Sequence, residues 1–436
     1  MKYTKFRLVD SGKVFYYQNT ENSLFNEDGE SLMLPPEHPY EWYQSVQGLF
    51  GVNHKNNKPT AIRILLGHAC NYSCAYCMQK DIGNPDERPE NIYAAMFVKN
   101  LEKLDLSNLE RIELWGGEPF LYWNDMKRIM PALDKKGRHF YISTNASALR
   151  QKHVDFFKEL QGTVAIGISH DGPGHERLRG EEVLNKPQVV SVLKQFDDMY
   201  PKVQYSFNSV ISNTNFDLFE INDFFRKFTQ EQGIKNAKLS FTLARSYDKT
   251  DSKNSFNHVI HGDNVPLFRD MLARYMDAKV AQLKEHGIRN DQRLLNSNIF
   301  DGEEGALKYA LKTKRNIPIT VTSNCGADSA DILSIDIQGN IRLCPHTSEE
   351  YIGGHINNLK GVKIVQLNLD RKYNHCLNCP VKRLCKSSCP IDLPDVTFFK
   401  NCTVEKIWFS AVQQTAFRLI FGEKVELVET NVDSIK

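Results

Sequence analysis

The chain has 436 residues, of which 41% are hydrophobic, so it can bury the core of one large domain and a smaller one. Its 55 Lys and Arg residues nearly balance its 53 Asp and Glu residues. The overall charge therefore predicts no general affinity for polyanions, and binding to DNA would need a local patch. No segment resembles a signal peptide or a membrane span, so we expect a cytoplasmic protein without a membrane partner.

Residues 1–58 are expected to form a β-rich N-terminal segment, with strand-like runs at 13–18 and 22–25. From 59 to 260, short apolar runs bounded by turn residues alternate with segments of helical spacing. Six runs read as buried strands, at 61–67, 111–117, 139–145, 163–169, 203–212 and 237–243. This alternation predicts an α/β fold with a parallel sheet wound as a partial (β/α)6 TIM-like barrel.

The second half of the chain divides into three expected parts. Residues 261–319 form a helical bridge, in which 265–287 is the clearest helix. Residues 320–405 hold most of the cysteines among short, turn-rich segments. This small domain therefore needs a covalent or metal crosslink to stabilise it. Residues 406–436 form a C-terminal helix and tail, the helix covering about 403–421.

Ten cysteines in a cytoplasmic chain favour metal or redox chemistry over disulfides. Three of them, Cys70, Cys74 and Cys77, follow the first barrel strand with the spacing C-x3-C-x2-C. Three thiolates can hold a 4Fe-4S cluster and leave one iron open for chemistry. A zinc site that uses His68 as fourth ligand, or three structural cysteines, is the alternative.

Further polar and glycine residues follow the next strands. Gly116, Gly117 and Glu118 follow the second strand, 143–145 the third, and 169–171 the fourth. The carboxyl ends of parallel strands line the active site of a barrel. We therefore expect these residues to meet the three cysteines at one site.

The stretch CNYSCAYC resembles the signature of the radical S-adenosylmethionine (SAM) superfamily, and WGGEP is similar to its GGE motif. This likeness implies that the three cysteines hold a 4Fe-4S cluster whose open iron binds SAM. It also implies reductive cleavage of SAM to a 5′-deoxyadenosyl radical, fed by a low-potential electron donor of the flavodoxin or ferredoxin type. The implied SAM-binding residues are Tyr76, Gly116, Gly117, Glu118, Ser143, Asn145, Ser169, Asp171, and Arg177 or Arg179.

The other seven cysteines resemble the SPASM extension of radical SAM enzymes, which holds two auxiliary 4Fe-4S clusters and would bring the total to three. By this likeness one cluster is held by Cys376, Cys379, Cys385 and Cys402, and the other by Cys325, Cys344 and Cys389. The fourth position of the second cluster is open, binds substrate, or is taken by Asp328 or His346, and His346 is also a candidate proton acceptor. Two zinc ribbons are the alternative for this region.

Enzymes with a SPASM extension mostly modify peptides, which implies a peptide or amino-acid-bearing substrate and a crosslink, oxidation or isomerisation. Pro345 follows Cys344 where the sulfatase-maturing branch carries an Asp, which disfavours sulfatase maturation. Residues 171–180 and the C-terminal region also look like phage proteins that rearrange amino-acid groups on modified DNA bases. A third possibility is a non-catalytic iron-sulfur protein that transfers electrons or binds a partner.

Overall fold

The computed structural model describes residues 2–18, 23–32, 55–79, 93–246, 257–286, 325–327, 329–344, 352–362, 376, 378–385, 389 and 395–433. Its largest feature is a nine-stranded sheet in the order β12-β11-β10-β4-β5-β6-β7-β8-β9. The strands from β4 to β9 are all parallel neighbours. The α/β fold and the partial TIM-like barrel predicted from the sequence are confirmed.

The six predicted barrel strands are all present. They are β4 (Ala61–Leu65), β5 (Arg111–Trp115), β6 (His139–Thr144), β7 (Thr163–Ser169), β8 (Val203–Ile211) and β9 (Lys238–Leu243). Every residue of β4 is buried, whereas β8 alternates buried and half-buried side chains along its length. Strand β4 is therefore covered on both faces of the sheet, whereas β8 has one face packed toward the interior and one face that is less covered.

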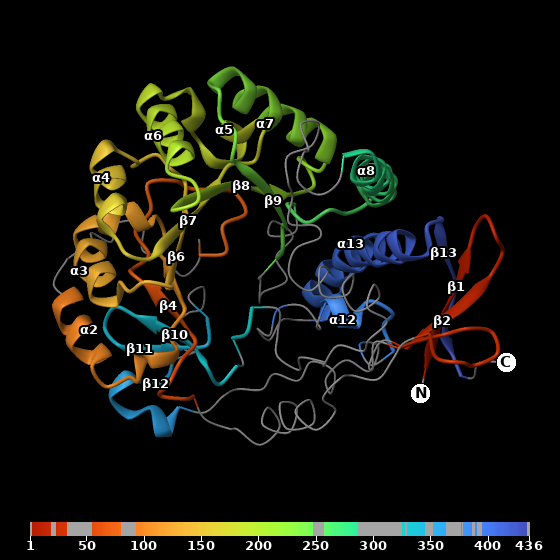
Figure 1. The fold of residues 1–436 in the computed structure, drawn as a ribbon, viewed down its shortest axis with the longest axis horizontal. Helices are drawn as coiled ribbons and strands as arrows, with labels where there is room; N and C mark the ends of the chain where they lie inside the picture. The colour runs from red at the N-terminus through yellow and green to blue at the C-terminus, as the bar shows by residue number, and fades with distance from the viewer. Residues whose placement is uncertain are drawn as a thin grey trace.

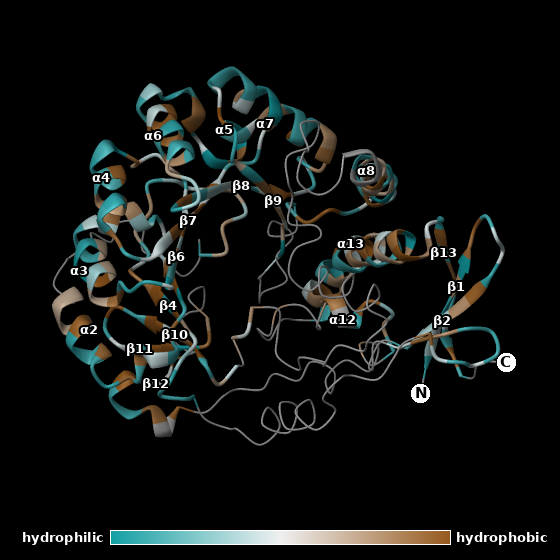
Figure 2. Ribbon diagram, in the orientation of Figure 1, coloured by the Kyte–Doolittle hydropathy of each residue, from teal (hydrophilic) through white to brown (hydrophobic). Residues whose placement is uncertain are grey.

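Helices cover the outer side of the curved sheet (Figure 1). They are α2 (Ala94–Leu101), α3 (Trp123–Leu133), α4 (Gln151–Glu159), α5 (His175–Arg179), α6 (Pro187–Asp198) and α7 (Leu218–Gln232), with short 3-10 turns η1 (Leu106–Asn108), η2 (Pro119–Tyr122) and η3 (Val183–Asn185). Figure 2 shows hydrophobic colour on β4 and β10, and both colours along the helices. Fully buried side chains such as Phe97, Phe157, Phe196 and Phe225 join the helices to the sheet, each contributing about 1.5–3 kcal/mol.

The local sequence explains where these helices begin and end. Asp217 caps α7, because its side chain accepts hydrogen bonds from the backbone N–H groups of Phe219 and Glu220. Gly233 ends the same helix in the left-handed conformation, with φ of 70°. Helix α6 begins with Pro187, which tolerates the first turn because its missing N–H has no partner there.

Part of the cysteine-rich region extends the barrel sheet. Strand β10 (Ile332–Asp336) pairs in parallel with β4, and β11 (Asn340–Arg342) and β12 (Ile352–His355) follow as antiparallel neighbours. A 3-10 turn, η6 (Ile356–Gly361), comes after β12. The buried ammonium of Lys55 donates to the carbonyls of Ala327, Ser329 and Ile332, at 2.9, 2.6 and 2.9 Å. The start of this region is therefore fastened to the segment that leads into β4.

The two ends of the described chain form a second sheet, in the order β13-β1-β2-β3. It contains β1 (Tyr3–Leu8), β2 (Val14–Gln18), β3 (Ser23–Phe25) and β13 (Val425–Val432). The rings of Phe6, Phe15 and Phe417 pack together at centroid distances of 5.1 to 5.3 Å. This cluster joins the sheet to the last helix, and Figure 1 shows the two termini side by side.

Three further helices complete the described elements: α8 (Asn264–His286), α12 (Lys382–Cys385) and α13 (Asp395–Phe421). Helix α13 begins eight residues before the position expected from the sequence, and it runs across the expected division between 405 and 406. The other expected domain boundaries stay predictions. No helix in the described ranges is both long and apolar enough to cross a membrane.

Candidate functional site

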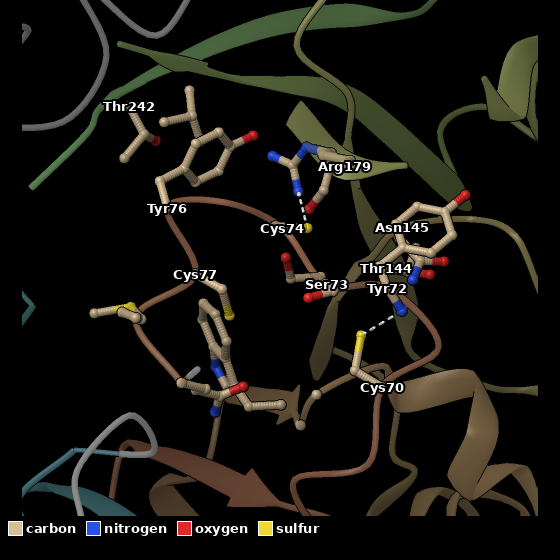
Figure 3. Close-up of a pocket in the computed structure, with 18 of the residues that line it drawn as sticks. Cys70, Tyr72, Ser73, Cys74, Tyr76, Cys77, Thr144, Asn145, Arg179 and Thr242 are labelled. Carbon is tan, nitrogen blue, oxygen red and sulfur yellow. Dashed lines mark hydrogen bonds between the residues drawn. The ribbon is translucent and has the colours of Figure 1, made fainter. Parts of the chain in front are cut away.

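A cavity of about 530 Å³ opens at the carboxyl ends of the barrel strands (Figure 3). Its walls come from the cysteine loop after β4, the turns after β5 and β6, and the ends of β7, β8 and β9. The lining residues expected from the sequence are Cys70, Cys74, Tyr76, Cys77, Gly116, Gly117, Ser143, Asn145, Ser169 and Arg179. The barrel thus brings together residues that are more than 100 positions apart in the chain.

The cysteine loop is held in place by its own backbone and by its neighbours. The Tyr72 N–H donates to the Cys70 sulfur at 3.4 Å, and the Ala75 N–H donates to the Leu178 carbonyl at 3.0 Å. Cys70 and Cys74 are half-buried, while Cys77 is exposed. Burial raises the pKa of the Cys70 thiol to about 11, so a bound cation is needed to favour its thiolate at neutral pH.

The glycine pair after β5 fits tightly beneath this loop. A Cβ on Gly117 would lie 2.3 Å from the Ala69 carbonyl oxygen and 2.4 Å from that of His68. Both obstacles are backbone atoms, which cannot move aside cheaply. The Gly117 N–H also donates to the Gly67 carbonyl at 3.0 Å. Gly117 is therefore required for the contact between the β5 turn and the cysteine loop, and Gly116 lies in the cavity wall beside it.

Glu118 is one of the expected SAM-binding residues that do not line the cavity. Its side chain is 1% exposed and lies outside the cavity lining. The carboxylate accepts hydrogen bonds from the Phe120 N–H at 3.0 Å, the Thr144 hydroxyl at 2.7 Å and the Asn145 N–H at 2.7 Å. Burial raises its pKa to about 7, although these donors oppose the shift. Glu118 thus fastens the β5 turn to the end of β6.

A buried network holds Arg179 at the edge of the cavity. Asp171 is fully buried and accepts two hydrogen bonds from the Arg179 guanidinium, at 3.0 and 3.1 Å. It also accepts a hydrogen bond from the Tyr76 hydroxyl. Burial opposes ionisation of Asp171, but Arg179 outweighs this effect and lowers the pKa of the carboxyl. The guanidinium lies over the Tyr76 ring and 3.9 Å from the Cys74 sulfur (Figure 3).

Arg177 and Arg179 were both candidates from the sequence, and the structure separates them. Arg177 is exposed on α5, whereas Arg179 is buried and lines the cavity. Sequence reasoning missed the lining residues at the end of the last strand, Thr242 to Arg245, and Val210 on β8. The rule that strand ends line a barrel site would have found them, since it applies to β8 and β9 as it does to the first four strands.

The second group of cysteines lies beside helix α13. Burial raises the pKa of Cys402 to about 12, and the nearby Cys379, Cys376 and Glu405 raise it further. Burial also raises the pKa of Cys385, where Glu405 acts in the same direction. Cys376 and Cys402 pack against Phe398. The four residues expected to form one ligand set therefore lie near one another, with Cys376 and Cys379 close to Cys402, and Cys379 and Cys402 close to Cys385.

The third group is described only in part. Cys325 is exposed, and its carbonyl accepts a hydrogen bond from the Arg63 guanidinium on β4. Cys344 and Cys389 are half-buried. The two candidate catalytic residues, Asp328 and His346, lie outside the described residues.

Among the described residues, no three His, Cys, Asp or Glu side chains are close enough to share a single metal ion. The Cys70, Cys74 and Cys77 loop nevertheless has the donor set of a three-cysteine cluster site. Its thiols open on a cavity within the usual size range of small-molecule sites. The buried cation of Arg179 lies next to the sulfur of Cys74. These residues fit an iron-sulfur cluster with a small anionic ligand beside it.

Residues 64–198 match the model of the radical SAM superfamily. The chain is 22% identical over 360 residues to the radical SAM cyclopropyl synthase TigE of Paramaledivibacter caminithermalis, covering 76% of this chain and 67% of TigE. It is also 22% identical over 334 residues to the antilisterial bacteriocin subtilosin biosynthesis protein AlbA of Bacillus subtilis, covering 73% of this chain and 65% of AlbA. The chain thus spans about two thirds of the length of these relatives.

The fold also resembles that of a solved structure. Native anSMEcpe with bound AdoMet superposes with a TM-score of 0.55 at 15% identity, over 83% of this chain and 99% of anSMEcpe. A second structure of anSMEcpe, with AdoMet and the Cp18Cys peptide, gives a TM-score of 0.54. At this level of identity the likeness shows the fold alone.

Proposed function

We propose, from the match of residues 64–198 to the radical SAM superfamily model, that the chain is an enzyme that modifies a peptide or an amino-acid-bearing substrate. The observation that carries the proposal is the opening of Cys70, Cys74 and Cys77 on one cavity with Arg179 and the strand-end residues. A cluster and SAM bound there would supply reductive cleavage of SAM and a 5′-deoxyadenosyl radical that removes hydrogen from an unactivated carbon.

The residues of this chain would bind and orient these groups. Cys70, Cys74 and Cys77 would hold the cluster through their thiolates. Arg179 would bind the SAM carboxylate, because Asp171 holds its guanidinium rigidly beside Cys74. Preorganisation of this kind lowers the entropy lost on binding.

The uncharged parts of the cavity would contact the remainder of SAM. Gly116 and Gly117 bring backbone groups to the wall, and the polar side chains there would bind the methionyl and ribose groups. These polar side chains are Ser143, Asn145 and Ser169. Tyr76 would pack near the adenine, with its hydroxyl fixed by Asp171.

The opposite wall is the place we propose for the substrate. Val210, Thr242 and Leu243 carry no charge and lie at the ends of β8 and β9. AlbA takes part in the biosynthesis of the bacteriocin subtilosin, which favours modification of a peptide over the other possibilities. A crosslink, an oxidation or an isomerisation is the proposed outcome.

We further propose two auxiliary clusters, for a total of three. Cys376, Cys379, Cys385 and Cys402 would hold one of them, since Cys379 and Cys402 lie close enough to raise the pKa of Cys385, and Cys376 and Cys379 that of Cys402. Cys325, Cys344 and Cys389 would give three ligands to the other, with Asp328 or His346 as candidates for the fourth. A flavodoxin or ferredoxin would supply electrons at low potential.

Anaerobic reconstitution with iron, sulfide, SAM and dithionite tests the proposal. The wild-type chain should release methionine and 5′-deoxyadenosine. Joint replacement of Cys70, Cys74 and Cys77 with Ala should abolish both products and leave about eight irons per chain, the content of two 4Fe-4S clusters. Mass spectrometry of peptides encoded beside the gene would then identify the substrate.

Replacement of Cys325, Cys344 and Cys389 with Ala is the matched control, because it removes the same number of thiols outside the cavity. This control should retain binding of SAM. Full cleavage by the variant lacking Cys70, Cys74 and Cys77, or zinc in place of iron and sulfide in the wild type, would refute the proposal.

A further inference from the structure

Two polar contacts join the end of the last barrel strand to helix α13. The Ser246 N–H donates to the Asn401 side-chain oxygen at 3.0 Å, and the Asn401 amide donates to the Ser246 carbonyl at 2.8 Å. One residue earlier, the Arg245 Nε lies 2.5 Å from a Glu405 carboxylate oxygen. Asn401 and Glu405 are four residues apart and therefore share one face of the helix. Both are buried, at 3% and 1% exposure.

Glu405 faces the second group of cysteines with its other oxygen. The Cys385 thiol donates to Glu405 Oε2 at 3.5 Å. Cys402 lies on the same helix, three residues before Glu405, and is also close enough to interact electrostatically with the Glu405 carboxylate. The carboxylate therefore lies between a cation from the barrel and two of the proposed cluster ligands.

Arg245 belongs to the cavity as well. It lines the wall together with Thr242, Leu243 and Ala244, at the mouth of the barrel. Its side chain is 29% exposed, whereas that of Glu405 is 1% exposed. One ion pair therefore spans the distance between the cavity and the second group of cysteines.

The charges in this arrangement must balance when a cluster is present. A ligating Cys385 is a thiolate, so the buried Glu405 carboxylate would add negative charge beside a negatively charged centre. An unpaired negative charge there disfavours the uptake of an electron, and a cation paired with it offsets the effect. Arg245 is the cation that pairs with Glu405.

We propose that Arg245 and Glu405 are a positioning pair that sets how readily the iron-sulfur group held by Cys376, Cys379, Cys385 and Cys402 is reduced. The inference rests on the proposed function, because it requires a cluster at these cysteines. The step concerned is the gain of one electron from an external reductant, with no bond formed or broken.

A redox titration of the full, anaerobically reconstituted chain tests this. The reductant is dithionite, and the signal followed by electron paramagnetic resonance is the one lost in a Cys385→Ala variant. Arg245→Gln should make reduction about tenfold less favourable, a shift of about 59 mV to lower potential for one electron. Glu405→Gln should shift the potential the other way, and the double variant should return near the wild type because the two lost charges cancel.

Two further variants separate charge from structure. Arg245→Lys keeps the positive charge and should therefore keep the reduction potential of the wild type. A variant that failed to fold would not keep it. Arg418→Gln is the matched control. Arg418 lies on α13 like Glu405, about 20 Å further along the helix, and pairs with Asp277 on α8. This control should leave the potential unchanged.

The outcomes that overturn the inference are distinct from those that overturn the proposed function. Equal potentials in the wild type and Arg245→Gln, or equal shifts in Arg245→Gln and Arg418→Gln, would overturn the inference alone, provided that SAM is cleaved. Loss of iron in Glu405→Gln would also overturn it, since Glu405 would then be a ligand. Absence of SAM cleavage in the wild type would overturn the proposed function.

Discussion

Glu118 lies buried beneath the cysteine loop, and replacing it with glutamine should change how the stability of the protein depends on pH. Burial raises the pKa of this carboxyl from 4.5 to about 7 in the folded chain. Between these two values the folded state holds a proton that the unfolded state has released. The stabilising effect of this proton is complete below pH 4.5 and is lost as the pH rises through 7.

The size of the effect follows from the shift. Each pKa unit corresponds to about 1.4 kcal/mol, so a change from 4.5 to about 7 corresponds to about 3 kcal/mol of unfolding free energy. The glutamine side chain of the variant is neutral at every pH and lacks this dependence. The difference in unfolding free energy between wild type and Glu118→Gln should therefore change by about 3 kcal/mol between pH 4.5 and 8, in the direction that favours the variant at high pH.

Urea unfolding at several pH values, followed by tryptophan fluorescence, measures this difference. Comparing each variant with wild type at the same pH removes the contribution of all other groups. Glu220→Gln, at an exposed position in the first turn of α7, is the matched control and should follow the wild type at every pH. Parallel curves for wild type and Glu118→Gln would show that burial does not govern this carboxyl.

Two further predictions concern the network around Asp171. Asp171→Asn leaves the buried Arg179 charge without its carboxylate, so unfolding experiments should show a loss of about 3–5 kcal/mol, against less than about 1 kcal/mol for Asp223→Asn, which breaks an exposed pair on α7. Arg179→Lys loses the bidentate geometry and should weaken SAM binding by about tenfold or more in equilibrium dialysis, while Arg177→Lys on the exposed face of α5 should bind as the wild type does. Equal affinities for the two lysine variants would remove Arg179 from the site.

The barrel strands could be predicted because each carries its own local signal. The run at 163–169 is short, rich in β-branched residues and bounded by turns, and the structure places β7 at the same residues. The strand-end rule then located Gly116, Ser143 and Ser169 in the cavity wall correctly. It could not tell that Asp171 and Glu118 are buried behind the cavity lining, because their positions depend on partners that only the folded chain supplies.

Strands β2 and β3 lie within the strand-like runs predicted at 13–18 and 22–25. Strands such as β10 and β13 could not be predicted, because their signal lies in distant partners. Strand β13 is exposed along nearly all of its length, so it lacks the alternation that identifies a half-buried strand. It is ordered by pairing with β1, more than 400 residues earlier. Strand β10 likewise joins β4 across about 270 residues. Pairings of this kind are set by the fold, and no local pattern encodes them.

Contacts between distant residues also surround the three groups of cysteines. A cation from the barrel reaches each of them: Arg179 lies beside the Cys74 sulfur, Arg63 donates to the Cys325 carbonyl, and Arg245 pairs with Glu405 next to Cys385. The sequence marked the first of these arginines as a candidate but not the other two, because they meet their partners only when the barrel closes. Removing one partner of a buried charge pair is costly, so the pairing with Asp171 holds Arg179 firmly beside the Cys74 sulfur. The spacing of the cysteines therefore predicts which thiols could act as ligands, whereas the charges beside them come from contacts that only the folded chain supplies.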